Sequence, residues 1–254
     1  MRILITGIEG TIGSILTREL ARDHEVSGID LLSSEKPGAA RADLRELAEI
    51  APLFRDIDVV IHLAAERRHE VEIGWDQLMG PNVIATASVF EAAHAAGVRR
   101  VVFASSMHAM GVYEVEEPYR SIVSGDYKGL DPRTVSLVTA GMPVRPDSRY
   151  GASKVFGEAL GRYYADVQGM EVISVRLGAV SDDDRPGFDS RSWVAWLSKR
   201  DVAALFRACV ERAGIRHEIV YGASANRWKV YDTPETWKVL GYTPSDNAED
   251  FREA

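Results

Sequence analysis

Two residues of the chain, Tyr150 and Lys154, have the types and the spacing of a proton-transfer pair. Residues four apart in a helix lie on one face, so the two side chains would point into the same space. Tyrosine has a reference pKa of about 10, and a positive charge nearby stabilises its phenolate form. Ser106, after a predicted strand, could supply a hydroxyl that holds the oxygen of a substrate. Such a unit needs a redox partner, for which the N-terminus carries a candidate site.

The first 20 residues have the pattern of a dinucleotide-binding unit. Residues 2–6 are an aliphatic run typical of a buried strand, and apolar residues recur at helical spacing from Ile12 onward. Between them lie three glycines that would allow a tight turn, close approach of the pyrophosphate and close packing of the helix on the strand: Gly7, Gly10 and Gly13. The pyrophosphate would lie at the N-terminus of the helix, where free N–H groups and the helix dipole favour anions.

A carboxylate, Asp30, ends the second predicted strand about 20 residues after Gly7. A glycine turn alone can be explained by backbone geometry. Here a strand precedes the turn, a helix follows it and an acid stands at the expected distance, and this combination favours cofactor binding. Asp30 is expected to accept hydrogen bonds from the adenosine ribose hydroxyls and to repel a 2′-phosphate. No arginine follows it in residues 31–33, so the pattern predicts NAD rather than NADP.

Strands and helices alternate along the rest of the chain. Strands are predicted at 58–65, 100–104, 171–177 and 217–221, and helices are predicted to begin at Asp43, after Asn82, at Tyr150 and at Ser198, with a small one at 237–241. This alternation predicts an α/β Rossmann fold, a doubly wound parallel sheet with helices on both faces. We expect one domain, with an NAD-binding core at about 1–170 and a small C-terminal substrate-binding portion at 171–254.

Residues 114–147 break this alternation. They carry mixed charge, several glycines and prolines, and no sustained periodicity, which predicts a long loop. Such a loop could be a lid over the site, a surface excursion or an oligomer contact.

Composition narrows the class of protein. A net charge of −8 gives no broad basic surface, which argues against nucleic acid as a partner. The single cysteine, Cys209, excludes an internal disulfide and fits a buried core position in a reducing cytosol. No signal peptide or membrane-spanning run is visible, so we expect a soluble, cytoplasmic protein. No cysteine or histidine cluster has metal-ligand spacing, and no metal site is predicted.

The motifs together resemble the extended, epimerase-like branch of the short-chain dehydrogenase/reductase superfamily over essentially the whole chain. The resemblance is carried by the glycine turn, Asp30, His62-Leu63-Ala64-Ala65, Asn82, Phe103-Ala104-Ser105-Ser106 and Tyr150-x-x-x-Lys154. It implies that Ser106 orients the substrate hydroxyl, that Tyr150 is the acid/base, and that Lys154 binds the nicotinamide ribose and lowers the tyrosine pKa. It further implies NAD contacts from Thr11, Ile12, Asp43, Leu44, Leu63, Ala64, Ala65, Asn82 and Leu177.

Within this branch the chain is similar to uronate dehydrogenases and to archaeal-type NAD-dependent glucose-6-phosphate dehydrogenases. Both oxidise the anomeric carbon of a free, anionic hexose to a lactone. About 80 residues follow the strand at 171–177, too few for the large lobe with which relatives hold nucleotide sugars. The resemblance therefore implies a small sugar. An epimerase or dehydratase that retains its NAD is the alternative enzyme, and a catalytically idle NAD-binding sensor is the alternative of another class.

The chain departs from the uronate pattern at substrate-facing positions. His108 and Arg191 are kept, but Met107 stands where the family has asparagine, and Arg67 and Ala179 stand where it has serines. The resemblance implies that Arg191 pairs with the anionic group of the substrate, since a guanidinium matches carboxylate, phosphate or sulfonate. Arg67 and its neighbour, Arg68, either clamp a strong anion or face water. We expect His108 to bind the substrate, and the family's habit implies a homodimer.

Overall fold

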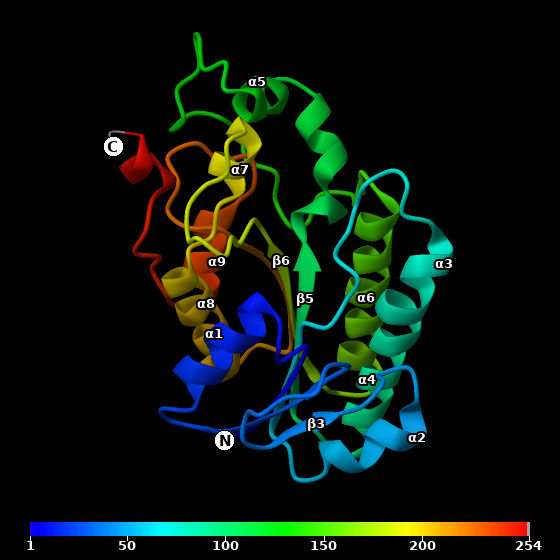
Figure 1. Ribbon diagram of the computed structural model, residues 1–254. Coiled ribbons are helices and arrows are strands. Elements are labelled where there is room, and N and C mark those ends of the chain that lie inside the picture. Colours follow the sequence, from blue (N-terminus) through cyan, green and yellow to red (C-terminus); the bar gives the residue numbers. More distant parts are fainter. Residues whose placement is uncertain (253–254) are drawn as a thin grey trace.

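The computed structural model describes residues 1–252 (Figure 1). Within them, seven strands form one sheet in the order β3-β2-β1-β4-β5-β6-β7, and all neighbours are parallel. The strands are β1 (Arg2–Thr6), β2 (Glu25–Asp30), β3 (Ala39–Arg41), β4 (Val59–His62), β5 (Arg100–Ser106), β6 (Glu171–Leu177) and β7 (His217–Gly222). The strand order reverses between β1 and β4, so the predicted doubly wound sheet is confirmed.

Helices cover both faces of the sheet. In Figure 1, α1 and α8 lie on one side of it and α2, α4 and α6 on the other. The helices are α1 (Thr11–Leu20), α2 (Leu47–Ile50), α3 (Trp75–Leu78), α4 (Ala85–Ala95), α5 (Tyr119–Ser124), α6 (Arg149–Asp166), α7 (Ser190–Ala195), α8 (Lys199–Glu211) and α9 (Thr233–Leu240). Alternate residues of the strands feed two cores: Ile3 and Ile5 pack with α1 and α8, and Leu4 packs with α4.

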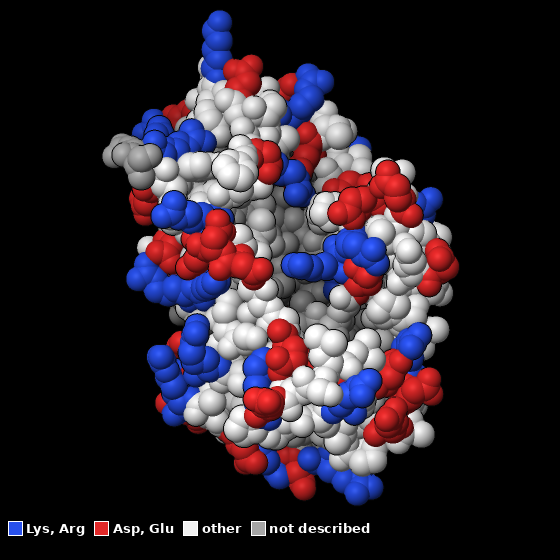
Figure 2. Space-filling view, in the orientation of Figure 1, with Lys and Arg blue, Asp and Glu red and all other residues white. Residues whose placement is uncertain are grey.

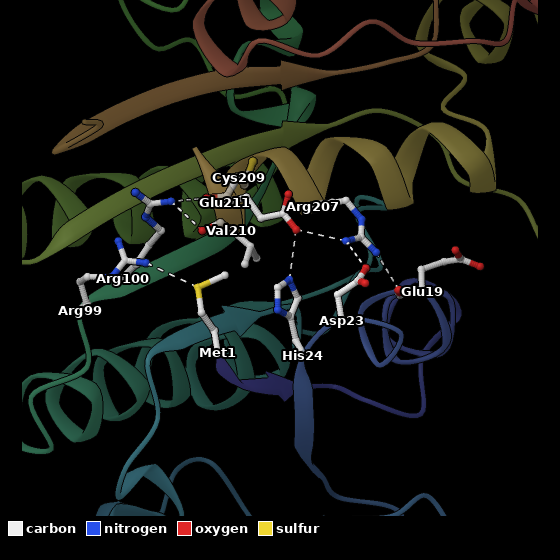
Figure 3. Close-up of polar contacts among 10 residues, drawn as sticks. All are labelled: Met1, Glu19, Asp23, His24, Arg99, Arg100, Arg207, Cys209, Val210 and Glu211. Carbon is white, nitrogen blue, oxygen red and sulfur yellow. Dashed lines mark hydrogen bonds and ion pairs between the residues drawn. The ribbon is translucent and has the colours of Figure 1, made fainter. Parts of the chain in front are cut away.

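A buried arginine fixes the end of α8 to the sheet (Figure 3). The guanidinium of Arg100, at the start of β5, is fully buried and donates to the carbonyl oxygens of Cys209 (2.7 Å), Val210 (2.9 Å) and Arg212 (2.8 Å). The last carbonyls of a helix have no partner within the helix, so Arg100 satisfies groups that would otherwise be buried without a hydrogen bond. It also pairs with Glu171 of β6.

A third core joins the irregular segment to the C-terminal elements. Ile122 of α5 and Val138 are fully buried and pack with Tyr221, Val230 and Tyr231. The prediction of a long loop at 114–147 is therefore wrong in part, because the segment contains α5 and a 3₁₀ turn, Gly111–Val115. Helices this short leave no visible periodicity. The proposed substrate-binding portion thus shares its core with this segment.

Other parts of the chain also differ from prediction. Asp43 does not cap a helix: its carboxylate binds the backbone and side chain of Arg45, and α2 begins at Leu47. Asn82 precedes the helix α4, as predicted, and lies in a π-helical turn, Met79–Ile84, between α3 and α4. The strand β3 and the helix α7 were not predicted. The Ser198 hydroxyl does cap α8, as expected.

Among residues 1–252, no helix has the length and apolar character needed to cross a membrane. In the same range, no group of three or more histidine, cysteine, aspartate or glutamate side chains is placed to hold a metal ion.

Candidate functional site

A cavity of about 930 Å³ opens beyond the carboxyl ends of the strands, where the strand order reverses. Figure 2 shows it as a hollow in the middle of the face, bordered by charged side chains of both signs. Its lining includes most of the residues predicted from the sequence: Gly7, Gly10, Thr11, Ile12, Gly13, Asp30, Asp43, Leu44, Leu63, Ala64, Ala65, Arg67, Ser106, Tyr150, Lys154 and Leu177. The switch in strand order thus brings together residues from seven separate parts of the chain.

The glycine turn fits a dinucleotide. Gly7 has a φ of +75°, which favours glycine. A Cβ on Gly13 would collide with the carbonyl oxygen of Gly7, so only glycine allows α1 to pack this closely on the turn. Residues 10–13, at the N-terminus of α1, line the cavity, which is where a pyrophosphate would lie.

Asp30 is held at the adenosine end of the cavity. Its carboxylate accepts hydrogen bonds from the backbone N–H groups of Glu9 (3.0 Å) and Leu32 (3.1 Å). These bonds fix the carboxylate at the tip of β2, where it can face ribose hydroxyls. The structure thus places Asp30 as the NAD interpretation requires.

Tyr150 lies in the first turn of α6. The Ser148 hydroxyl caps this helix by accepting from the N–H of Gly151 (3.0 Å). A Cβ on Gly151 would collide with the carbonyl oxygen of His108, so this glycine lets α6 approach the turn after β5. The approach brings the Tyr150 hydroxyl next to Ser106, whose hydrogen bond acts on it.

The electrostatics of Tyr150 differ in one respect from expectation. Burial raises the pKa of Tyr150 to about 12, while a hydrogen bond from Ser106 and the charge of Arg67 act to lower it. Lys154 is buried, which lowers its own pKa to about 8. Its ammonium donates to the carbonyl of Ala104 (2.9 Å) and lies 5.5 Å from the centre of the Tyr150 ring. Arg67 is thus a further cation whose charge lowers the pKa of Tyr150, a role that the sequence did not assign to it.

The two adjacent arginines separate. Arg67 lines the cavity, whereas Arg68 turns back and pairs with the carboxylate of Glu66 at 2.7 Å. Asn82 fixes the backbone at this point: its amide accepts from the N–H of Glu66 (2.7 Å) and donates to its carbonyl (2.9 Å). Asn82 is not among the described residues that line the cavity, so the structure gives it the role of holding the cavity rim.

Two histidines lie over Tyr150. The Nδ1 atom of His108 binds the carboxylate of Asp147 at 2.8 Å, and its ring centre lies 5.8 Å from that of Tyr150. The ring of His69 packs on His108 with 4.2 Å between centres. Sequence reasoning missed His69, although its position two residues after Arg67 was a usable signal. Met107 is buried in the third core.

Arg191, from α7, carries an ion pair that the sequence did not predict. Its Nε atom lies 2.5 Å from a carboxylate oxygen of Glu114, and the other oxygen accepts from the hydroxyl of Tyr231 (2.6 Å). The charge of Arg191 also acts on Asp147, the partner of His108. Burial raises the pKa of Asp147, but its bonds to His108 and the charge of Arg191 together hold that pKa below its ordinary value.

Comparison with known proteins agrees with this geometry. A sequence model described as the NAD dependent epimerase/dehydratase family matches residues 3–200. The chain is 35% identical to L-arabinose 1-dehydrogenase (NAD(P)(+)) of Haloferax volcanii over 97% of both chains, and 34% identical to NAD-dependent glucose-6-phosphate dehydrogenase of the same organism over 98% of this chain and 95% of that one. It superposes on the crystal structure of uronate dehydrogenase from Agrobacterium tumefaciens with a TM-score of 0.80 and 31% identity, covering 99% of this chain and 87% of that one. The chain belongs to the NAD-dependent epimerase/dehydratase family.

Proposed function

We propose that this protein is an NAD-dependent dehydrogenase that oxidises C1 of a free sugar to its lactone. The observation that carries the proposal is the meeting of Tyr150, Ser106 and Lys154 in one cavity with the glycine turn. The three relatives named above are dehydrogenases by name, and two act on sugars as small as arabinose and glucose 6-phosphate.

The reaction consists of two transfers, a proton from the C1 hydroxyl and a hydride from C1. Bound NAD⁺ would supply the acceptor for the hydride that leaves C1. Tyr150, as phenolate, takes the proton of the C1 hydroxyl, and Ser106 holds the same oxygen by a hydrogen bond. Lys154, anchored on the carbonyl of Ala104, would hold the nicotinamide ribose beside Tyr150. A positioned proton transfer of this kind is typically worth about 10²–10⁴-fold in rate.

We further propose that the sugar is a hexose that carries an anionic group, a carboxylate, phosphate or sulfonate. Arg67 and Tyr150 both line the cavity. Arg191 is not among the described lining residues, but its charge acts on Asp147, the partner of His108, whose ring lies 5.8 Å from that of Tyr150. Each guanidinium can give an anion two parallel hydrogen bonds. Arg68 is paired with Glu66, so the proposal rests on Arg67 and Arg191 as the cations.

The direct test is NADH formation by the purified protein. The panel contains glucuronate, galacturonate, glucose 6-phosphate and sulfoquinovose, with glucose and L-arabinose as neutral sugars and NADP⁺ as the parallel cofactor. We expect one anionic sugar to respond strongly with NAD⁺. A response only to a neutral sugar would overturn the anionic class. No response to any sugar, with NAD⁺ binding intact, would overturn the dehydrogenase and favour an epimerase or a sensor.

A homodimer in the cytoplasm is part of the same proposal. Tyr163 of α6, Val167 directly after it and Ile84 directly before α4 are 47%, 64% and 48% exposed, and exposed apolar side chains of this kind support pairing of copies. Light scattering behind a sizing column is expected to give twice the mass of the chain. A mass of one chain at micromolar concentration would contradict the dimer.

Arg67 is expected to set the pH dependence of oxidation. Only the phenolate form of Tyr150 can take the proton, so kcat/KM should rise with pH, by up to about tenfold per unit below the pKa. Arg67 lowers the pKa of Tyr150, so Arg67→Gln should raise it and shift the profile toward higher pH. The measurement is kcat/KM from about pH 6 to about pH 10. Arg68→Gln is the matched control, and equal profiles in the two variants would contradict the role of Arg67.

A further inference from the structure

Glu114 has an unusual position for a charged residue that the sequence placed in a loop. Its side chain is only 10% exposed, and both of its oxygens are engaged, one by Nε of Arg191 at 2.5 Å and the other by the Tyr231 hydroxyl at 2.6 Å. Because a buried carboxylate is costly unless it is paired and hydrogen-bonded, these two partners account for its presence.

The pairing determines which atoms of Arg191 face a ligand. A guanidinium has five N–H donors in a rigid plane. Glu114 takes the one on Nε, and within residues 1–252 no hydrogen bond from either terminal nitrogen of Arg191 is formed. The two terminal nitrogens are therefore the edge left for a planar anion, which they can bind through two parallel bonds.

The elements behind Glu114 are firmly held. The N–H of Val112 donates to the carbonyl of Arg145 (3.0 Å), which fixes the 3₁₀ turn that carries Glu114. Tyr231 is 2% exposed and its ring stacks on Tyr221 at 5.0 Å. Arg191, by contrast, belongs to α7, a helix of only six residues, and its side chain is 33% exposed. The rigid partner is thus Glu114, and the side chain that gains orientation is Arg191.

We propose that Glu114 is a positioning residue that orients Arg191 to receive the anionic group of the sugar through its terminal nitrogens. The inference rests on the proposed function and deepens it. Since the carboxylate offsets the charge of Arg191, recognition of the anion depends on the direction of the N–H bonds on the two terminal nitrogens more than on net charge.

The test is a double-mutant cycle on Glu114 and Arg191, measured with the best anionic substrate. Glu114→Ala is expected to raise KM about tenfold, since a charge-assisted hydrogen bond is lost from the group that binds the substrate, with kcat changed less than about threefold. Tyr231→Phe, which loosens Glu114 without changing its charge, should raise KM about threefold. The double variant E114A/R191A should have the KM of Arg191→Ala alone, because the effect of Glu114 passes through Arg191.

The matched control is Glu116→Ala. Glu116 lies two residues away and pairs with Arg145 at 2.7 Å, but it is half exposed, so its removal should leave KM and kcat unchanged. Thermal unfolding of each variant identifies a loss of structure, and Tyr231→Phe carries the test where Glu114→Ala does not fold.

The outcomes separate the two levels of the proposal. A lower KM in Glu114→Ala, or additive effects in the double variant, would overturn the positioning role and leave the proposed function intact. An unchanged KM in Arg191→Ala would overturn the anion contact and the role of Glu114 with it. Absence of sugar oxidation in the unmodified protein would overturn the proposed function and this inference together.

Discussion

Replacing Tyr150 with phenylalanine is expected to lower kcat/KM for sugar oxidation by about 10²–10⁴-fold while NAD⁺ binding is retained. The substitution removes the hydroxyl that takes the proton and keeps the ring, which packs near His108 and Lys154. NADH formation measures the first effect, and titration calorimetry with NAD⁺ measures the second.

Tyr164→Phe is the control for this change. Tyr164 lies on the same helix, but its hydroxyl donates to Glu91 at 2.6 Å, outside the described lining of the cavity. It should leave turnover within about twofold, since the ring that packs in the core with α4 is retained and the lost hydroxyl does not reach the cavity. Full activity in Tyr150→Phe would require another base. Loss of NAD⁺ binding with turnover would instead make Tyr150 a structural residue of the cofactor site.

Replacing Arg100 with methionine is expected to destabilise the fold by about 3–5 kcal/mol. Methionine has a similar length, but it leaves the carbonyls of Cys209, Val210 and Arg212 buried without a donor and Glu171 without its buried partner. The measurement is urea unfolding followed by circular dichroism, read as a shift of the midpoint.

The neighbouring arginine provides the comparison. Arg99 pairs with the same carboxylate, Glu171, but its side chain is 47% exposed. An exposed ion pair contributes about 0–1 kcal/mol, so Arg99→Met should shift the midpoint little. Equal losses in the two variants would show that the shared carboxylate, and not the capping of α8, accounts for the effect.

The part of the fold that could be predicted is the part with strong local patterns. Buried aliphatic runs gave six of the strands because a parallel sheet covered on both faces leaves them apolar throughout. The three-residue β3 and the six-residue α5 and α7 are too short for their periodicity to be visible. Asp43 has the type of a helix cap, but a nearer partner, Arg45, takes its carboxylate.

In the candidate site, the sequence predicted those residues that stand at the end of a strand or the start of a helix, because the predicted strand or helix fixes their position. Gly7, Asp30, Ser106 and Tyr150 each follow from the strand end or helix start on which they stand. The Arg191–Glu114 pair could not be predicted in this way. The two residues are 77 positions apart in the sequence. The distribution of charges along the chain does not predict which of several acidic residues an arginine will pair with.

The clamp of Asn82 on the backbone of Glu66 has a consequence for how this site can change. Both polar groups of Glu66 are held by an amide that comes from another helix, so the path of the chain at position 67 does not depend on the side chain there. The side chain at position 67 can thus be changed while the backbone that carries it stays in place. Substitutions at position 67 are therefore expected to leave the path of the loop unchanged, which makes this position a place to begin a directed-evolution library.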